Sequence, residues 1–284
     1  MEPFVRKKSN SDEPELFVLE KLQERFPFVQ AGFTSRHGGV SSAPFDSFNL
    51  GLHVNDADED VVENRKRLAA ALGVPFEALT FGEQVHGKEV EVIEKKQMGS
   101  GRISRADAIQ DKDAFITAEK GIMLCALYAD CVPLYLIDPV NRVVGVAHAG
   151  WKGTVQNIGA AALASMTRSF GSRPEDVYAV IGPSIGGCCY EVDDFVAGRV
   201  YESHLDTGIS KKQTETVVIP RKEGKYQLNL QECNRQFLEK AGILSSHIEV
   251  TELCTSCSTD LFFSHRKEGG STGRMAAWIG LRND

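Results

Sequence analysis

The sequence lacks any long apolar run. Nowhere do about eighteen apolar residues follow one another, the length that a membrane-spanning helix needs. The N-terminal stretch MEPFVRKKSNSDEPELF also lacks the apolar segment of a leader peptide. We therefore expect a cytoplasmic protein that does not associate with membranes.

The chain also lacks an excess of positive charge. It has 32 lysines and arginines against 39 aspartates and glutamates, which gives a net charge of -7. The field of such a protein repels nucleic acid and anionic membrane surfaces, so neither is expected as a partner. A small anionic substrate would need a local basic pocket.

The cysteines do not form a disulfide framework. There are seven of them, an odd number, which suits a reducing compartment where thiols are buried, bind metals or act as nucleophiles. Cys254 and Cys257 form a CxxC pair in CTSC, but no second CxxC accompanies it. We therefore expect two partly buried thiols there rather than a complete zinc site, and the adjacent Cys188 and Cys189 receive no role.

The order of apolar patterns predicts a single layered α/β domain with mixed sheets. No internal repeat or linker interrupts the chain after a charged segment, so we expect a flexible lead-in at 1–15 and one domain over 16–284. The runs 122–128 and 142–147 are almost continuously apolar, which indicates strands covered on both faces. Strands are predicted at 29–34, 78–85, 88–94, 113–117, 122–128, 133–138, 142–148, 177–182, 246–252 and 274–281, and helices at 57–73, 152–170, 191–203 and 229–241.

Three residues that could bind a metal stand at strand ends. His86 in QVHG, Cys131 in ADCVP and His148 in VAHAG each close or follow a strand-like run, beside small or turn-forming residues. Two imidazoles and one thiolate are a workable zinc shell with one position left open, as in catalytic sites. Buried thiols and hydrogen-bonded core histidines use the same residue types, and the wide spacing does not choose between the two interpretations. Asp130 could orient a ligand histidine or satisfy backbone donors at a turn.

Basic residues in glycine-rich segments are candidates for binding an anion. Arg36 and His37 precede a Gly-Gly pair in TSRHGGVS, and Lys152 stands in the first turn of the helix that follows AHAGW, where a cation is unfavourable. Arg266 lies in FFSHRKEGGSTGR, which could close over a phosphate or a base, or be an exposed polar loop. The turn IGPSIGGCCYEV matches no nucleotide-binding loop, but it could form a substrate wall. Trp151 could likewise be a wall or a core anchor.

Taken together and in order, these motifs resemble the laccase-domain family, which was long described as multicopper polyphenol oxidases and later assigned as zinc-containing purine nucleoside phosphorylases. The motifs that carry the resemblance are TSRHGGVS, FNLGLHVND, QVHG, ALYADCVPLYLID, VGVAHAGWKGT, IGPSIGGCCYEV, NLQECNRQFL and FFSHRKEGGSTGRMAAWIGL, from about residue 29 to 282. The resemblance implies one zinc held by His86, Cys131 and His148. It also implies phosphorolysis of adenosine, inosine, guanosine and methylthioadenosine to base and ribose 1-phosphate, with deamination of adenosine as a side activity.

Two other activities, and a non-catalytic role in binding a partner protein through an exposed apolar patch, remain open at the level of the sequence. A copper-dependent phenol oxidase is one, although multicopper sites use His-x-His pairs and none of the seven histidines is so paired. A metal-free hydrolase with Cys131 as nucleophile and His148 as base is the other. In the zinc interpretation, Arg36, His37, Lys152 and Arg266 would bind phosphate and nucleoside.

Overall fold

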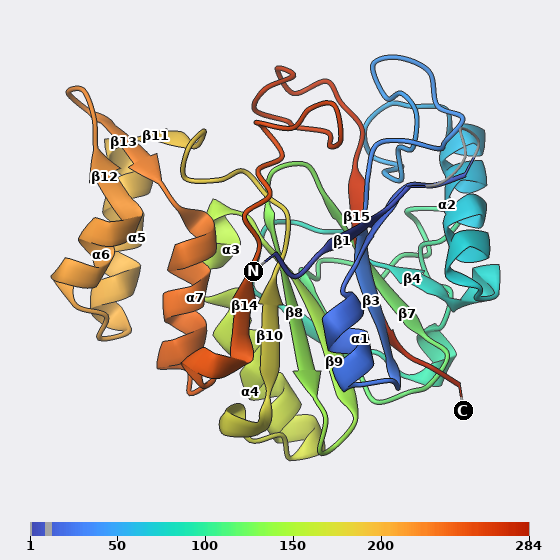
Figure 1. Ribbon diagram of the computed structural model, residues 1–284, viewed down its shortest axis with the longest axis horizontal. Helices are drawn as coiled ribbons and strands as arrows, with labels where there is room; N and C mark the ends of the chain where they lie inside the picture. Colours follow the sequence, from blue (N-terminus) through green and yellow to red (C-terminus); the bar gives the residue numbers. More distant parts are fainter. Residues whose placement is uncertain (1, 9–12, 284) are drawn as a thin grey trace.

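The computed structural model describes residues 2–8 and 13–283. Its core is a pair of six-stranded sheets packed face to face, with helices on both outer faces (Figure 1). The first sheet has the order β1 (Val5–Lys7), β2 (Leu16–Val18), β3 (Val29–Thr34), β15 (Met275–Leu281), β7 (Met123–Tyr128) and β4 (Leu79–Phe81). The second has the order β14 (Ile248–Val250), β10 (Tyr178–Ile181), β8 (Val132–Asp138), β9 (Val143–Ala149), β6 (Ala114–Thr117) and β5 (Val90–Val92).

Strand β7 shows why the central strands are apolar on both faces. Leu124, Ala126 and Tyr128 point into the core between the two sheets, whereas Cys125 and Leu127 belong to the layer beneath helix α2 (Asp58–Leu72). Every residue of β7, β8 and β9 is buried. The prediction of a layered single α/β domain with doubly covered strands is thus confirmed.

The outer face of the second sheet is covered by α4 (Ile158–Phe170) and α7 (Leu230–Lys240), with the short α3 (Trp151–Val155) beside them. A small third sheet of β11 (Glu191–Asp193), β13 (Lys225–Leu228) and β12 (Val218–Pro220) lies with α5 (Asp194–Asp206) and α6 (Lys211–Val217) at the left of Figure 1. Helix α1 (Glu20–Arg25) precedes β3, and the described part also has short 3-10 helices at Phe76–Ala78, Lys95–Gln97, Pro174–Asp176 and Ser245–His247. None of the helices in the described part of the chain has the length and apolar character that crossing a membrane requires.

The structure corrects the prediction for the lead-in and for two of the predicted helices, and it adds elements that were not predicted: β2, α1, α6, β12 and β13. Val5–Lys7 pair with Leu16–Val18 and Phe4 is buried, so these residues of the expected lead-in belong to the first sheet; residues 9–12 lie outside the described part. The helix expected at 152–170 is divided because Asn157 adopts a left-handed conformation and its side chain caps α4. The helix expected at 191–203 begins only at Asp194, after strand β11.

Candidate metal centre

The structure brings His86, Cys131 and His148 together. Their ligand atoms all lie within 4.8 Å of one another, and the two imidazole rings meet edge to face with centroids 4.7 Å apart. His148 comes from β9 and Cys131 directly precedes β8, which are neighbouring strands of the second sheet. His86 reaches them from the loop after β4, in a left-handed conformation with φ of 61°.

Gly150 allows this close approach. A Cβ atom at that position would lie 2.9 Å from Cys131 Sγ and 3.0 Å from His86 Cδ2, which no side chain tolerates without displacing one of them. Gly153 is similarly close to the backbone oxygens of His148 and Gly87. The glycines of AHAGWKG are therefore needed for packing around the three side chains.

Asp113 orients this group, and sequence analysis did not single it out. Its carboxylate, which is fully buried, accepts a hydrogen bond from His148 Nδ1 at 2.9 Å and from the backbone N–H groups of Val85, His86 and Gly87 at 3.1, 2.9 and 2.7 Å. One acidic side chain thus fixes both the ring of His148 and the turn that carries His86. Oriented in this way, His148 leaves Nε2 for a metal ion, as a carboxylate partner commonly does for a ligand histidine.

The carboxylate of Asp130 binds donors of a different segment. It accepts hydrogen bonds from the Thr255 hydroxyl at 2.6 Å and from the backbone N–H of Arg266 at 2.7 Å. Of the two interpretations of Asp130, the one in which it satisfies loop donors is therefore confirmed.

The three candidate ligands perturb one another's ionisation. Burial by itself raises the pKa of Cys131, but His148 and His86 outweigh it and bring the pKa to about 6. Burial lowers the pKa of His148, whereas Cys131 and Asp113 raise it, to about 9. Burial also raises the pKa of Asp113, yet His148 and the backbone N–H groups hold it below its usual range. The cysteine is thus poised as a thiolate, the form that binds a metal.

Two cavities meet at His86 and Cys131, and His148 lines the first of them. The first, of about 290 Å³, is lined by His86, Cys131 and His148 together with polar side chains that include His53, Arg105 and Arg274. The second, of about 340 Å³, is lined by His86 and Cys131 and by a mixture of aromatic, aliphatic and basic side chains. Its other lining residues are Ala129, Asp130, Trp151, Lys152, Ile185, Tyr190, Leu230, His265 and Arg266.

Of the expected anion-binding residues, Lys152 and Arg266 line the second cavity. Arg266 donates to the backbone oxygen of Glu191 at 2.8 Å and lies over the ring of Tyr190, 4.9 Å from its centroid. Among the described residues, no carboxylate forms an ion pair with either Lys152 or Arg266. Both cations are therefore available to a ligand. Ile185 and Tyr190, from the turn IGPSIGGCCYEV, also line this cavity.

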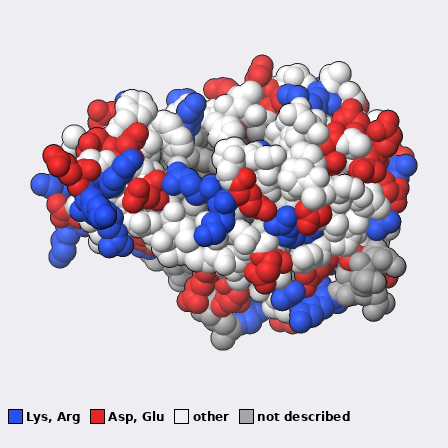
Figure 2. All heavy atoms as spheres, turned by 90° about the horizontal axis from the view of Figure 1, so that it is seen from above, with Lys and Arg blue, Asp and Glu red and all other residues white. Residues whose placement is uncertain are grey.

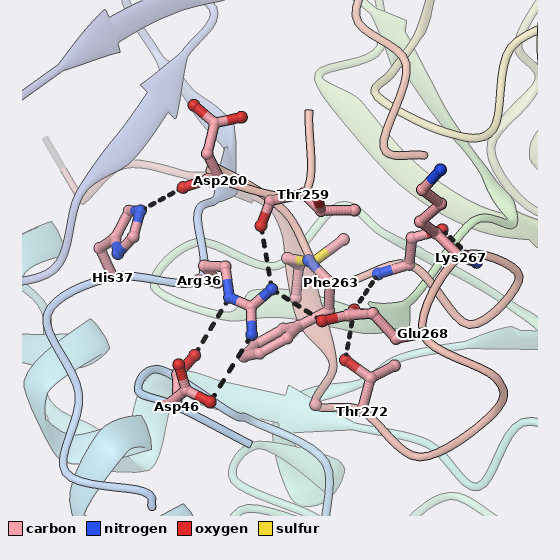
Figure 3. A network of polar contacts seen from close by, with 12 residues as sticks. Arg36, His37, Asp46, Thr259, Asp260, Phe263, Lys267, Glu268 and Thr272 are labelled. Atoms are coloured by element: carbon pink, nitrogen blue, oxygen red, sulfur yellow. Dashed lines mark hydrogen bonds and ion pairs between the residues drawn. The ribbon is translucent and has the colours of Figure 1, made fainter. Parts of the chain in front are cut away.

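Arg36 and His37 lie elsewhere. Figure 3 shows the guanidinium of Arg36 bound to Glu268 at 2.8 Å and to the backbone oxygens of Thr259 and Asp46, while it stacks on Phe263 at 4.5 Å. His37 contacts the backbone oxygen of Asp260 through Nε2. Neither residue lines either cavity, so the expected phosphate cradle at TSRHGG is not formed. These side chains instead hold the loop 259–272 against the end of β3.

Figure 2 shows charged side chains of both signs on one face of the molecule. Acidic and basic side chains of the described residues are interspersed there, around a central area of uncharged side chains. This distribution agrees with the modest negative net charge.

The fold is a four-layer α/β sandwich, and it places two imidazoles and a thiolate beside two cavities. The protein is therefore of the class of α/β proteins with a candidate catalytic metal centre. The chain matches the family model described as multi-copper polyphenol oxidoreductase laccase over residues 30–282, and it belongs to this family. It is 43% identical over 254 residues, 89% of each chain, to "Purine nucleoside phosphorylase YlmD" of Bacillus subtilis. It is 44% identical over 262 residues, 91% of this chain and 92% of the relative, to the protein of the same name from Geobacillus stearothermophilus. The crystal structure of YlmD from Geobacillus stearothermophilus covers 100% of both chains with a TM-score of 0.91 and 39% identity.

Proposed function

We propose that this protein is a zinc-dependent purine nucleoside phosphorylase, with deamination of adenosine as a side activity. Its substrates would be adenosine, inosine, guanosine and methylthioadenosine together with inorganic phosphate. The observation that carries the proposal is the convergence of His86, Cys131 and His148 where the two cavities meet. The relatives named purine nucleoside phosphorylase supply the substrate class.

The three residues fit zinc. One thiolate and two imidazoles are the donor set that zinc prefers, and Asp113 supplies the carboxylate partner that ligand histidines commonly have. The absence of a side chain at Gly150 leaves room for Cys131 and His86 to lie close together. When bound, zinc would supply a Lewis acid at the junction of the two cavities.

Phosphorolysis requires a positioned anion and a held purine. The phosphate oxygen forms a bond to the anomeric carbon as the glycosidic C–N bond breaks, and the purine leaves with the electron pair and takes up a proton. Lys152 and Arg266, which line the second cavity without carboxylate partners among the described residues, would bind the phosphate. Trp151 and Tyr190 line the same cavity and offer faces on which a purine can stack.

One observation favours a second candidate. A cysteine with a pKa of about 6 beside a histidine with a pKa of about 9 is a thiolate–imidazolium pair, as in cysteine hydrolases. In that case Cys131 would attack the substrate and His148 would donate a proton to the leaving group. The two candidates differ in their need for metal.

The test is phosphate-dependent release of base from adenosine by protein of known metal content. The zinc-loaded enzyme should form adenine and ribose 1-phosphate only when phosphate is present. It should also form a small amount of inosine by deamination. Protein stripped of metal should lose both activities and regain them with zinc. A metal-free enzyme that remains active and is inactivated by iodoacetamide would instead support the hydrolase. Oxidation of a phenol with copper, but no phosphorolysis with zinc, would support the oxidase.

A further inference from the structure

A second cluster of cysteines lies away from the three candidate ligands. Cys188 and Cys189 belong to the glycine-rich turn that precedes β11, and Cys254 and Cys257 belong to the loop that follows β14. Their four sulfur atoms all lie within 4.8 Å of one another. The sequence predicted no complete zinc site at CTSC because no second CxxC accompanies it, but the structure places the adjacent pair Cys188 and Cys189 beside it.

The distances between the sulfur atoms suit a shared metal ion. Cys188 Sγ lies 3.8 Å from Cys189 Sγ and 3.5 Å from Cys257 Sγ, and the Cys189 and Cys257 sulfurs are 3.3 Å apart. Four thiolates placed tetrahedrally at about 2.3 Å from a zinc ion have sulfurs roughly 3.8 Å apart. All four cysteines are free thiols, and their sulfur atoms form one cluster rather than two separate pairs.

The backbone around Cys254 supports the thiolate form. The backbone N–H of Gly186 donates to Cys254 Sγ at 3.2 Å, across the two loops. Four thiolates this close repel one another, and a divalent cation would relieve that repulsion. Thiolates are soft ligands, so the four cysteines would bind zinc in preference to magnesium or calcium.

The cluster joins two loops that line the second cavity. Thr255 N–H donates to the Ser184 oxygen at 3.0 Å, so the two loops already run side by side at this point. The first loop carries Ile185 and Tyr190, and the segment after the second carries His265 and Arg266. A metal ion at the cluster would tie together the two segments that supply these parts of the wall.

We propose that Cys188, Cys189, Cys254 and Cys257 form a second metal centre, a tetrathiolate zinc site that fastens the loop before β11 to the loop after β14. This site is separate from His86, Cys131 and His148 and does not depend on the proposed activity. Closed sites with four thiolates are structural, since no position is left for water or substrate. Its occupancy should therefore hold the second cavity in shape without taking part in the chemistry.

The experiment counts metal ions in three forms of the full chain, purified anaerobically, loaded with zinc and desalted. The wild type should hold two zinc ions per chain. Cys131→Ser, which alters only the first centre, should keep one, and the double variant Cys254→Ser/Cys257→Ser should also keep one. Cobalt loaded into Cys131→Ser should give the strong near-ultraviolet sulfur-to-cobalt charge-transfer bands and the visible bands of tetrahedral thiolate coordination.

The Cys131→Ser arm keeps the proposal testable even if the double variant does not fold, because it leaves all four cysteines in place. A wild type with one zinc ion and a Cys131→Ser variant with none would overturn the proposal. So would a disulfide among the four cysteines, found by mass spectrometry after alkylation of the anaerobically purified protein. Retention of one metal ion by Cys131→Ser with the cobalt spectrum of a histidine-rich site would also contradict it.

Discussion

Replacement of Asp113 by Asn should weaken zinc binding at His86, Cys131 and His148 without removing any ligand. The carboxylate accepts four hydrogen bonds, two on each oxygen, from His148 Nδ1 and three backbone N–H groups. An amide in the same place can keep two of them, but its NH₂ group then faces two buried donors. The ring of His148 loses its charged partner, and the turn of His86 loses part of its anchor.

The size of the effect follows from these contacts. Loss of a carboxylate that orients a ligand histidine typically lowers metal affinity by about 10- to 100-fold, or about 1.4 to 2.8 kcal/mol. Two buried donors left without acceptors cost about 1 to 3 kcal/mol each in folding stability. We therefore expect Asp113→Asn to show both a weaker zinc affinity and a lower free energy of unfolding.

The assay is competition for zinc against a chromophoric chelator, at a temperature where circular dichroism shows that the variant is folded. Asp130→Asn is the matched control, because Asp130 precedes Cys131 in the chain and accepts comparable hydrogen bonds from Thr255 and Arg266, but none from a ligand histidine. It should lose stability and keep its zinc affinity at the first centre. If Asp113→Asn binds zinc as tightly as the wild type does, the orienting role of Asp113 is refuted.

Three further changes test other parts of the site. Gly150→Ala should lose the metal ion of the first centre, measured by elemental analysis as one zinc ion fewer per chain, since its Cβ would lie 2.9 Å from Cys131 Sγ. A variant that holds as much zinc as the wild type would contradict the packing argument. Lys152→Met should raise KM for phosphate by about 10-fold, the loss of one charged contact, and leave KM for the nucleoside nearly unchanged. An equal rise in both constants would place Lys152 away from the phosphate. Burial lowers the pKa of His204 to about 4, so the unfolded state binds more protons below pH 6.5 and stability falls as the pH decreases from 6.5 toward 4. Between pH 7 and 5, His204 should account for about 2 kcal/mol of the decrease in unfolding free energy, and His204→Gln should lack this part of the decrease when measured by urea denaturation. An unchanged pH dependence in the variant would count against this role of His204.

The periodic parts of the fold could be predicted from the sequence. All ten predicted strands overlap strands of the structure, although those expected at 78–85, 88–94 and 246–252 are only three residues long. Strands buried on both faces, such as Met123–Tyr128, agree most closely because they leave an unbroken apolar run. Val5–Lys7 escaped prediction because a short edge strand among charged residues buries little, and only pairing with Leu16–Val18 makes it a strand. The break at Asn157 depends on a single left-handed residue within an otherwise helical pattern.

The same distinction holds for the candidate site. His86, Cys131 and His148 could be found because each stands where a recognisable strand ends. Asp113 could not, since an acidic residue at the start of a strand does not reveal that four donors converge on it. Arg36 was wrongly expected to bind a ligand, because its glycine-rich surroundings are those of an anion site. In the structure, Glu268, which is far away in the sequence, forms an ion pair with its guanidinium.

The central claim is that zinc at His86, Cys131 and His148 is required for phosphorolysis. The most direct measurement is the rate of phosphate-dependent base release as zinc is titrated into metal-free protein, with Cys131→Ser treated in parallel. The rate should rise in proportion to the zinc bound at this centre and stay at background in Cys131→Ser. Full phosphorolysis by metal-free protein, or by Cys131→Ser, would contradict the claim.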